Sequence, residues 1–162
     1  MRFEATITYP ASVGQSADML ADEAFLQQRV AAAGGSATQV DVAREGAAFT
    51  SSVATRLPTD GVPASFRSFV GAHLDVRIVE AWEAPRPTGE RRGTIAIDIA
   101  GAPVTVRGQM RLVAYGEGCR HDVRGEVRAS VPLFGRAIEE AAISAVNSVI
   151  SGQEQVARAY LT

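Results

Sequence analysis

Hydrophobic positions recur every three or four residues through the last part of the chain, from Val131 to Leu161. The polar positions between them keep the same period, which predicts an amphipathic helix with one apolar face. We expect the helix to run from about Leu133 to Tyr160, a length of roughly 40 Å. Its apolar positions are Phe134, Ile138, Ala141, Ala142, Ala145, Val146, Val149, Val156 and Tyr160. A helix of that length must lie across a wide surface.

Most of the remaining chain alternates hydrophobic and polar residues with a period of two, which is typical of half-buried strands. Seven such segments are expected: residues 2–9, 37–43, 47–56, 74–83, 91–99, 103–115 and 119–131. Because most of the connections between them are short, consecutive strands should form hairpins and the sheet should be antiparallel. This sheet is the surface that the long helix covers.

Short helices are expected between some of the strands. Residues 12–33 predict two of them, with a break near Asp22, which caps the second, and an end at Gly34–Gly35. Residues 63–70 predict another, with Phe69 facing inward. The fold class is therefore α+β: a seven-stranded curved antiparallel sheet that grips a long C-terminal helix, with two short helices after strand 1.

Length and composition indicate one domain over residues 1–162. The net charge of -2 gives no reason to expect nucleic acid as a partner, and no hydrophobic run is long enough for stable membrane insertion. The N-terminus enters a strand pattern directly and Cys119 is the one cysteine, so we expect a cytoplasmic protein. Two histidines and one cysteine without ligand spacing predict no metal site, and we expect no cofactor. A monomer and a homodimer both remain open.

Two polar residues fall on the apolar faces of predicted strands. Glu80 lies between Ile78 and Trp82, and His121 lies between Cys119 and Val123. A buried carboxylate is unfavourable by several kcal/mol unless it is paired, so Glu80 needs a partner or a raised pKa. His121 is one candidate partner, and either residue could instead face a ligand. The alternative is structural: both lie half solvated near strand ends, or pair with an arginine such as Arg107 or Arg111.

Small residues occur on both of the surfaces that should face each other. The expected sheet face contains Ser51, Gly108, Gly125 and Ala129, and the helix contributes Ala137, Ala141, Ala142 and Ala145. A tightly filled core of this size would use larger side chains at these positions. The pattern therefore predicts either a close approach of helix to sheet or a cavity of ligand size between them, and we favour the cavity.

Several segments resemble a known group of proteins. They are MLADEAFLQQRVAAAGG (19–35), VPASFRSFVG (62–71), Glu80 and Trp82 within VEAW, and VPLFGRAIE (131–139). Over essentially the whole chain they resemble the START-like or Bet v 1-like helix-grip superfamily, also called SRPBCC, and within it a bacterial domain-of-unknown-function branch. The resemblance implies a deep apolar cavity for lipids, sterols, polyketides or other hydrophobic small molecules. Some members of this group are cyclases or aromatases, and others are carriers.

Our leading hypothesis is the binding or transport of a hydrophobic small molecule or lipid between the sheet and the C-terminal helix. Glu80 and His121 would orient a polar group of the ligand, and we assign no catalytic residue. The other expected ligand-binding residues are Phe49, Ile78, Trp82, Val106, Met110, Ile138, Ala142 and Val149. The alternative is a polyketide cyclase or aromatase-like enzyme with Glu80 or His121 as general acid–base. A protein–protein interaction module would require a large exposed apolar patch, which the well-alternated outer faces do not predict.

Overall fold

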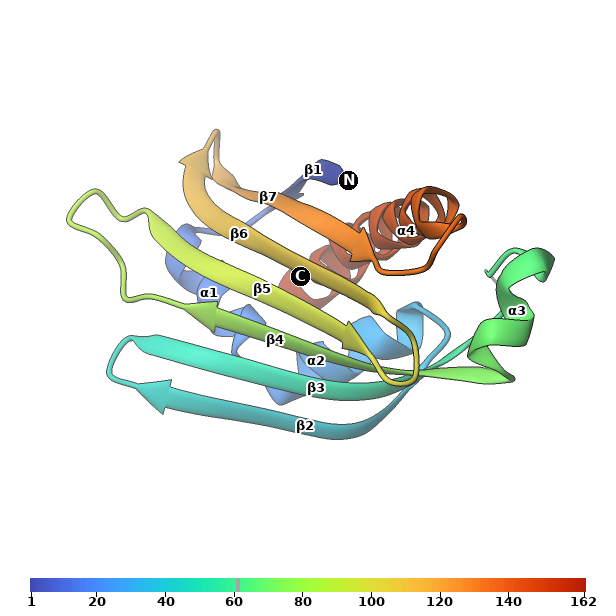
Figure 1. Cartoon of the computed structure of the whole chain (residues 1–162). Coiled ribbons are helices and arrows are strands. Elements are labelled where there is room, and N and C mark those ends of the chain that lie inside the picture. Colours follow the sequence, from blue (N-terminus) through green and yellow to red (C-terminus); the bar gives the residue numbers. More distant parts are fainter. Residues whose placement is uncertain (61) are drawn as a thin grey trace.

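A computed structural model describes residues 1–60 and 62–162, and at Phe69 the backbone alone. The chain forms one antiparallel sheet whose strands lie in the order β1-β7-β6-β5-β4-β3-β2, with the helices α1, α2 and α4 on one face (Figure 1). The strands are β1 (Arg2–Tyr9), β2 (Ser36–Glu45), β3 (Ala48–Pro58), β4 (His73–Trp82), β5 (Arg91–Ile99), β6 (Val104–Tyr115) and β7 (Gly118–Ala129). The helices are α1 (Val13–Leu20), α2 (Glu23–Ala32), α3 (Ala64–Val70) and α4 (Gly135–Leu161). The predicted fold class is confirmed.

Alternation within the strands places the predicted apolar face toward the helices. In β3, for example, Phe49, Ser51, Val53 and Thr55 are all buried, while the residues between them are more exposed. The curved sheet (Figure 1) contains two paired glycines at which the backbones approach closely. Gly108 of β6 lies opposite Gly125 of β7, and a Cβ on either would come within 2.7 Å of a carbonyl oxygen of the other strand. Only glycine tolerates that approach.

The two helices after β1 begin and end where the sequence predicts. Ser12 caps α1, and its hydroxyl and the Gln15 side chain form a capping box. Asp22 caps α2 by accepting a hydrogen bond of 2.8 Å from the backbone N–H of Ala24. Beyond α2, Gly34 has a φ of +78°, the left-handed conformation in which helices commonly end.

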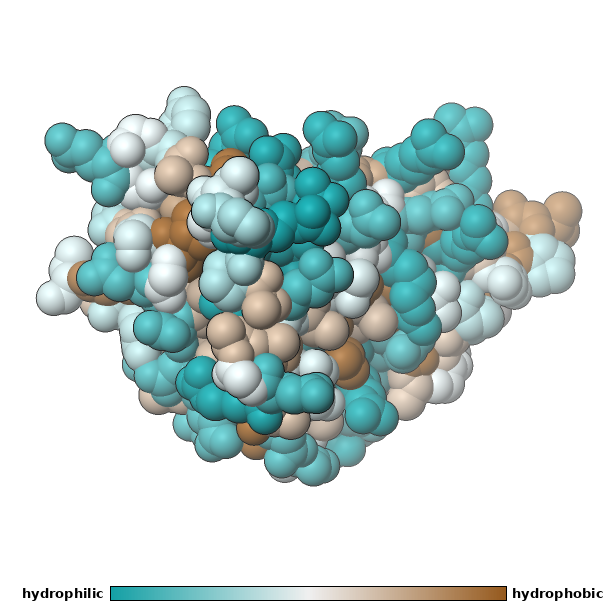
Figure 2. All heavy atoms as spheres, turned by 90° about the vertical axis from the view of Figure 1, so that its left-hand side faces the viewer, coloured by the Kyte–Doolittle hydropathy of each residue, from teal (hydrophilic) through white to brown (hydrophobic). Residues whose placement is uncertain are grey.

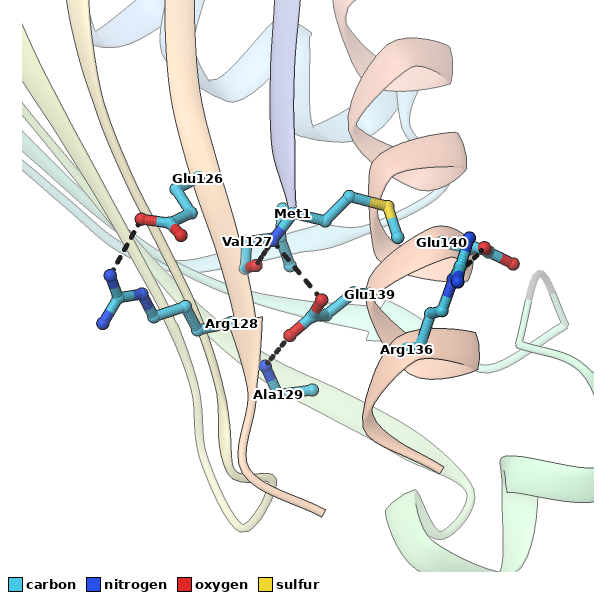
Figure 3. Close-up of polar contacts among 8 residues, drawn as sticks. All are labelled: Met1, Glu126, Val127, Arg128, Ala129, Arg136, Glu139 and Glu140. Atoms are coloured by element: carbon cyan, nitrogen blue, oxygen red, sulfur yellow. Dashed lines mark hydrogen bonds and ion pairs between the residues drawn. The ribbon is translucent and has the colours of Figure 1, made fainter. Parts of the chain in front are cut away.

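Helix α4 is attached to the sheet near its N-terminal end and to α2 near its C-terminal end. Near the N-terminal end, the Glu139 carboxylate accepts hydrogen bonds from the Ala129 N–H (3.0 Å) and from the Met1 amino group (3.3 Å), as Figure 3 shows. Near the C-terminal end, the ring of Tyr160 packs edge-on against that of Phe25 in α2 at a centroid distance of 5.6 Å. The helix contacts β1, β7 and α2, so it runs beside one edge of the sheet rather than across all strands.

Helix α3 lies apart from the other helices, at the end of the sheet where α4 begins (Figure 1). It confirms the short helix predicted there, and the ring of Phe66 packs edge-on against that of Phe134 at 6.4 Å. The predicted inward orientation of Phe69 lies outside the described residues. In the part of the chain that the structure describes, no helix combines the length and the hydropathy that crossing a membrane requires.

Candidate functional site

The inward-facing residues of the sheet are buried at one end, which we call the filled end, and several of them are only partly covered toward the other end. At the filled end the rings of Tyr9 and Trp82 are buried together with Met110 and Leu112. Figure 2 shows the outer surface of this end, where hydrophilic residues dominate and hydrophobic ones form small groups. The surface visible there therefore lacks the large apolar patch that an interaction module would require.

Glycine shapes the filled end of the concave face. Trp82 of β4 lies opposite Gly93 of β5, and a Cβ on Gly93 would come within 2.9 Å of two atoms of the indole ring. The ring therefore lies over β5 and reaches toward β7, where its centroid is 5.3 Å from that of His121. The absence of a side chain at Gly93 brings two predicted ligand-binding residues from separated strands into contact.

Toward the other end of the sheet the inward-facing apolar residues are less covered. Ile78 of β4 is half-buried, although it shares a face with the buried Glu80 and Trp82. On β5, which pairs with β4, Ile95, Ile97 and Ile99 are half-buried as well. Of the other predicted lining residues, Phe49, Val106 and Met110 are buried. The sheet therefore presents partly open apolar surface toward the helix layer.

Helix α4 presents a matching half-buried stripe. Ile138, Ala142, Val146 and Ile150 pack only partly against the core, and of the 27 residues of this helix only Gln153 and Ala157 are buried. Val149 follows Ala142 by seven residues and therefore lies on the same side of the helix. It is nevertheless 36% exposed, so this side of α4 is open to solvent and Val149 does not lie in an enclosed cavity.

The predicted inward orientation of the alanines of α4 is only partly correct. Ala141 and Ala142 are half-buried, but Ala137 and Ala145 are exposed. The predicted apolar stripe is wider than the observed one, because alanine is compatible with either face of a helix and does not by itself indicate burial.

Glu80 has a partner that the sequence analysis did not identify. Arg29 of α2 donates to its carboxylate at 2.8 Å, and the two side chains are only 7% and 4% exposed. The predicted arginines lie elsewhere: Arg107 pairs with Asp98 and Arg111 with Glu90 in partly exposed contacts. The expectation of half-solvated strand ends was also wrong, since Glu80 and His121, each counted as a whole residue, are both 3% exposed.

Arg29 belongs to a chain of buried hydrogen bonds that ends at His121. The same Arg29 nitrogen lies 3.3 Å from the Gln153 Oε1 atom of α4, and the Gln153 Nε2 atom donates to the Tyr9 hydroxyl at 2.7 Å. The Tyr9 hydroxyl oxygen lies 2.9 Å from Nδ1 of His121. Glu80 and His121 are therefore not direct partners: Arg29, Gln153 and Tyr9 connect them. We call these five residues and Trp82 the polar cluster.

The sequence contains a signal for the three residues that were missed. Arg29 follows Phe25 by four residues and Leu26 by three, so it shares their apolar helix face. Gln153 follows Val146 by seven residues and lies on the apolar line of α4. Tyr9 shares the buried face of β1 with Phe3 and Ile7, as the alternation of residues 2–9 indicates, and it brings a hydroxyl group to that face. A polar side chain on each of three apolar faces indicates a buried network.

Burial sets the protonation of this cluster. It lowers the pKa of His121 to about 4, an effect that the nearby Arg29 reinforces and Glu80 opposes, so the imidazole is neutral at pH 7. Burial also raises the pKa of the Tyr9 hydroxyl, which stays protonated. A base with a pKa near 4 is a weak proton acceptor at neutral pH. The arrangement is therefore better suited to holding a polar group than to moving a proton.

Four buried polar atoms of this cluster have no hydrogen-bond partner among the described residues: Arg29 Nη2, Glu80 Oε2, Trp82 Nε1 and His121 Nε2. They are also the full set of such side-chain atoms in the described part of the chain. Buried polar groups are normally paired, and each unpaired one is unfavourable by about 1–3 kcal/mol. Their concentration in one cluster marks it as the candidate site.

Cysteine and metal chemistry receive no support from the described residues. Burial raises the pKa of the Cys119 thiol, whose sulfur lies 3.0 Å from the Ser16 hydroxyl. A buried thiol of this kind is protonated and unreactive. No group of three His, Cys, Asp or Glu side chains within residues 1–60 and 62–162 is arranged to hold a metal ion.

Solved structures share this fold at low sequence identity. The protein TTHA0849 from Thermus thermophilus is 18% identical over the whole of both chains with a TM-score of 0.62. A START superfamily protein from Mycobacterium smegmatis is 13% identical over 99% of each chain, with a TM-score of 0.58. A STAR-related lipid transfer protein from Xanthomonas axonopodis is 13% identical over 94% of this chain and 85% of its own, with a TM-score of 0.55. At these identities the similarity shows the fold alone, and it confirms that this fold is START-like.

No curated protein matches the sequence. The family described as protein of unknown function DUF2505 matches residues 4–161, nearly the whole chain. This agrees with the branch of unknown function that the sequence resembles. The chain belongs to the DUF2505 family.

Proposed function

We propose that this protein binds a hydrophobic small molecule or lipid between its sheet and α4, and carries it. The observation that supports this most directly is the half-buried apolar surface on both layers. Ile95 and Ile97 on β5, and Ala142 and Val146 on α4, remain partly exposed although they pack at the margin of the core. Covering such surface with a ligand is favourable by roughly 25 cal/mol per Å².

The fold gives independent support. START-like proteins include a STAR-related lipid transfer protein that covers 94% of this chain. Ligand sites generally combine an apolar wall with a few buried polar groups. Here the half-buried isoleucines provide the wall, and the unpartnered atoms of the polar cluster provide the polar groups.

The acid–base alternative receives less support. Arg29 already occupies one oxygen of Glu80, and burial keeps His121 neutral with a pKa of about 4. His121 therefore lacks the pKa that a general acid or base needs near neutral pH, and Glu80 is held in an ion pair. A binding role requires no proton transfer and agrees with the same geometry.

Native mass spectrometry of freshly purified protein, before and after organic extraction, tests the proposal. We expect a mass increment that extraction removes, with an apolar molecule in the extract. Ala142→Phe should abolish the increment by filling the space beneath the helix, whereas Ala145→Phe, at an exposed position of the same helix, should retain it. A protein that carries no extractable molecule and takes up none when exposed to lipid would refute the proposal.

A further inference from the structure

The direction of each hydrogen bond in the polar cluster follows from its chemistry. Arg29 can only donate, so the Gln153 atom facing it must be the amide oxygen. The Gln153 amide nitrogen then donates to the Tyr9 oxygen, and the hydroxyl hydrogen of Tyr9 is left to bind Nδ1 of His121. A neutral imidazole that accepts at Nδ1 carries its proton on Nε2. The hydrogen bonds therefore select one tautomer of His121.

The unpartnered atoms consequently have known roles. Nε2 of His121, Nε1 of Trp82 and Nη2 of Arg29 are donors, and Oε2 of Glu80 is an acceptor. All four residues are at least nine-tenths buried, with 6% exposure for Arg29 and 3% or less for the other three. The rings of Trp82 and His121 are in edge-on contact, with their centroids 5.3 Å apart, so two of the donors belong to side chains that touch each other.

Charge restricts what these atoms can bind. Arg29 and Glu80 neutralise each other in their ion pair, and His121 and Tyr9 are neutral, so the cluster has no net charge. An ionised ligand group would lose its hydration without gaining a counter-ion, which is strongly unfavourable. A group that only accepts or only donates would leave some of the four atoms unsatisfied. A hydroxyl donates one hydrogen bond and accepts two, so it can satisfy Glu80 and two of the three donors, which is more of this set than either of those groups can satisfy.

We propose that the polar cluster recognises an uncharged hydroxyl group at one end of an otherwise apolar ligand. Glu80 accepts the hydrogen bond from this hydroxyl, and donors among His121, Trp82 and Arg29 bind its oxygen. The inference rests on the proposed function, because the apolar part of the ligand lies in the space between the sheet and α4. It excludes fatty acids in their ionised form and amines as the preferred ligands.

Three ten-carbon probes with the same chain test this: decanol, decanoate and decylammonium. Binding is followed by calorimetry and by the emission of Trp82, the single tryptophan of the chain. We expect decanol to bind at least tenfold more tightly than either ion, because burying an unpaired charge is far more unfavourable than burying a paired hydroxyl. Trp82→Phe and His121→Phe should each weaken decanol binding about three- to tenfold, the usual effect of one hydrogen bond.

The variants separate this inference from the proposed function. If Ala142→Phe blocks all probes but decanoate binds wild-type protein as tightly as decanol, the cavity stands and hydroxyl recognition is refuted. The same conclusion follows if Trp82→Phe and His121→Phe leave the preference unchanged, because the cluster then holds water or is purely structural. If no probe binds, or if Ala142→Phe does not affect binding, the proposed function fails as well. Should either cluster variant fail to fold, the preference of the wild-type protein alone decides.

Discussion

Arg29 of α2 and Glu80 of β4 form an ion pair of 2.8 Å beneath the helices, 51 residues apart in the sequence. Both side chains are almost completely buried, and each retains one polar atom that has no partner among the described residues. The pair links the short helix layer to the sheet. It also places two charged groups in the buried layer, where Arg29 contacts Gln153 as well.

Glu80→Ala should destabilise the protein by about 3–5 kcal/mol, because it leaves the Arg29 guanidinium buried without a counter-charge. Chemical denaturation measures this. The double variant Arg29→Met with Glu80→Leu should recover most of the loss, since neither charge then remains. As a control, Glu140→Ala breaks the partly exposed pair with Arg136 and should have an effect below about 1 kcal/mol. An equally small effect of Glu80→Ala would show that the pair is not buried in solution.

The stability of the protein should fall as the pH drops from about 6.5 toward 4. Burial lowers the pKa of His121 from 6.5 to about 4. In this range the unfolded state therefore binds a proton that the folded state does not. A shift of this size is equivalent to roughly 3 kcal/mol at its full extent. Denaturation at pH 7.0, 5.5 and 4.5 should show the loss.

Two variants identify the source of this pH dependence. His121→Phe should lose most of the pH dependence between about 6.5 and 5.5, because it removes the titrating group, whereas below about 5 carboxylates whose pKa is lowered, such as Glu139, also contribute. His73→Gln, at a side chain that is 45% exposed, should behave like the wild type. If His121→Phe retained the full pH dependence, another group would be responsible and His121 would not be neutral through burial.

Gly93→Ala should be destabilising by about 1–3 kcal/mol, since the added methyl group would meet the Trp82 ring at 2.9 Å and a backbone oxygen at 2.7 Å. The emission of Trp82 should change as the ring moves. Gly152→Ala, inside α4, is the control: apart from its chain neighbours and the adjoining helix backbone, no atom of the described residues lies within 4 Å of the added carbon. It should stabilise the protein by about 1 kcal/mol. If both variants changed the stability in the same direction, this account of Gly93 would be wrong.

Leu133→Gly should stabilise the protein by about 1 kcal/mol. Leu133 has a φ of +68°, a left-handed conformation that is unfavourable for a residue with a side chain. The side chain is 99% exposed, so its removal loses no packing. Leu133→Ala retains the backbone strain and should leave the melting temperature almost unchanged. Equal melting temperatures for the two variants would contradict this account.

Local patterns were sufficient to predict the secondary structure. The period-two segments became the seven strands, and the end of α2 at Gly34 was predicted as well. These features depend on contacts between residues close in the chain, or on a face that an element must bury whatever covers it. The inner-face positions of Glu80 and His121 follow from the same alternation.

The partners of those residues depended on the tertiary structure. Arg29 reaches Glu80 from a helix, and Gln153 reaches Tyr9 across 144 positions of sequence. Such contacts exist only once the sheet has curved and the helices have packed on it, so no local pattern specifies them. The sequence by itself determined the elements and their buried faces. The tertiary structure decided which polar side chains meet, because that depends on the distance and direction between elements.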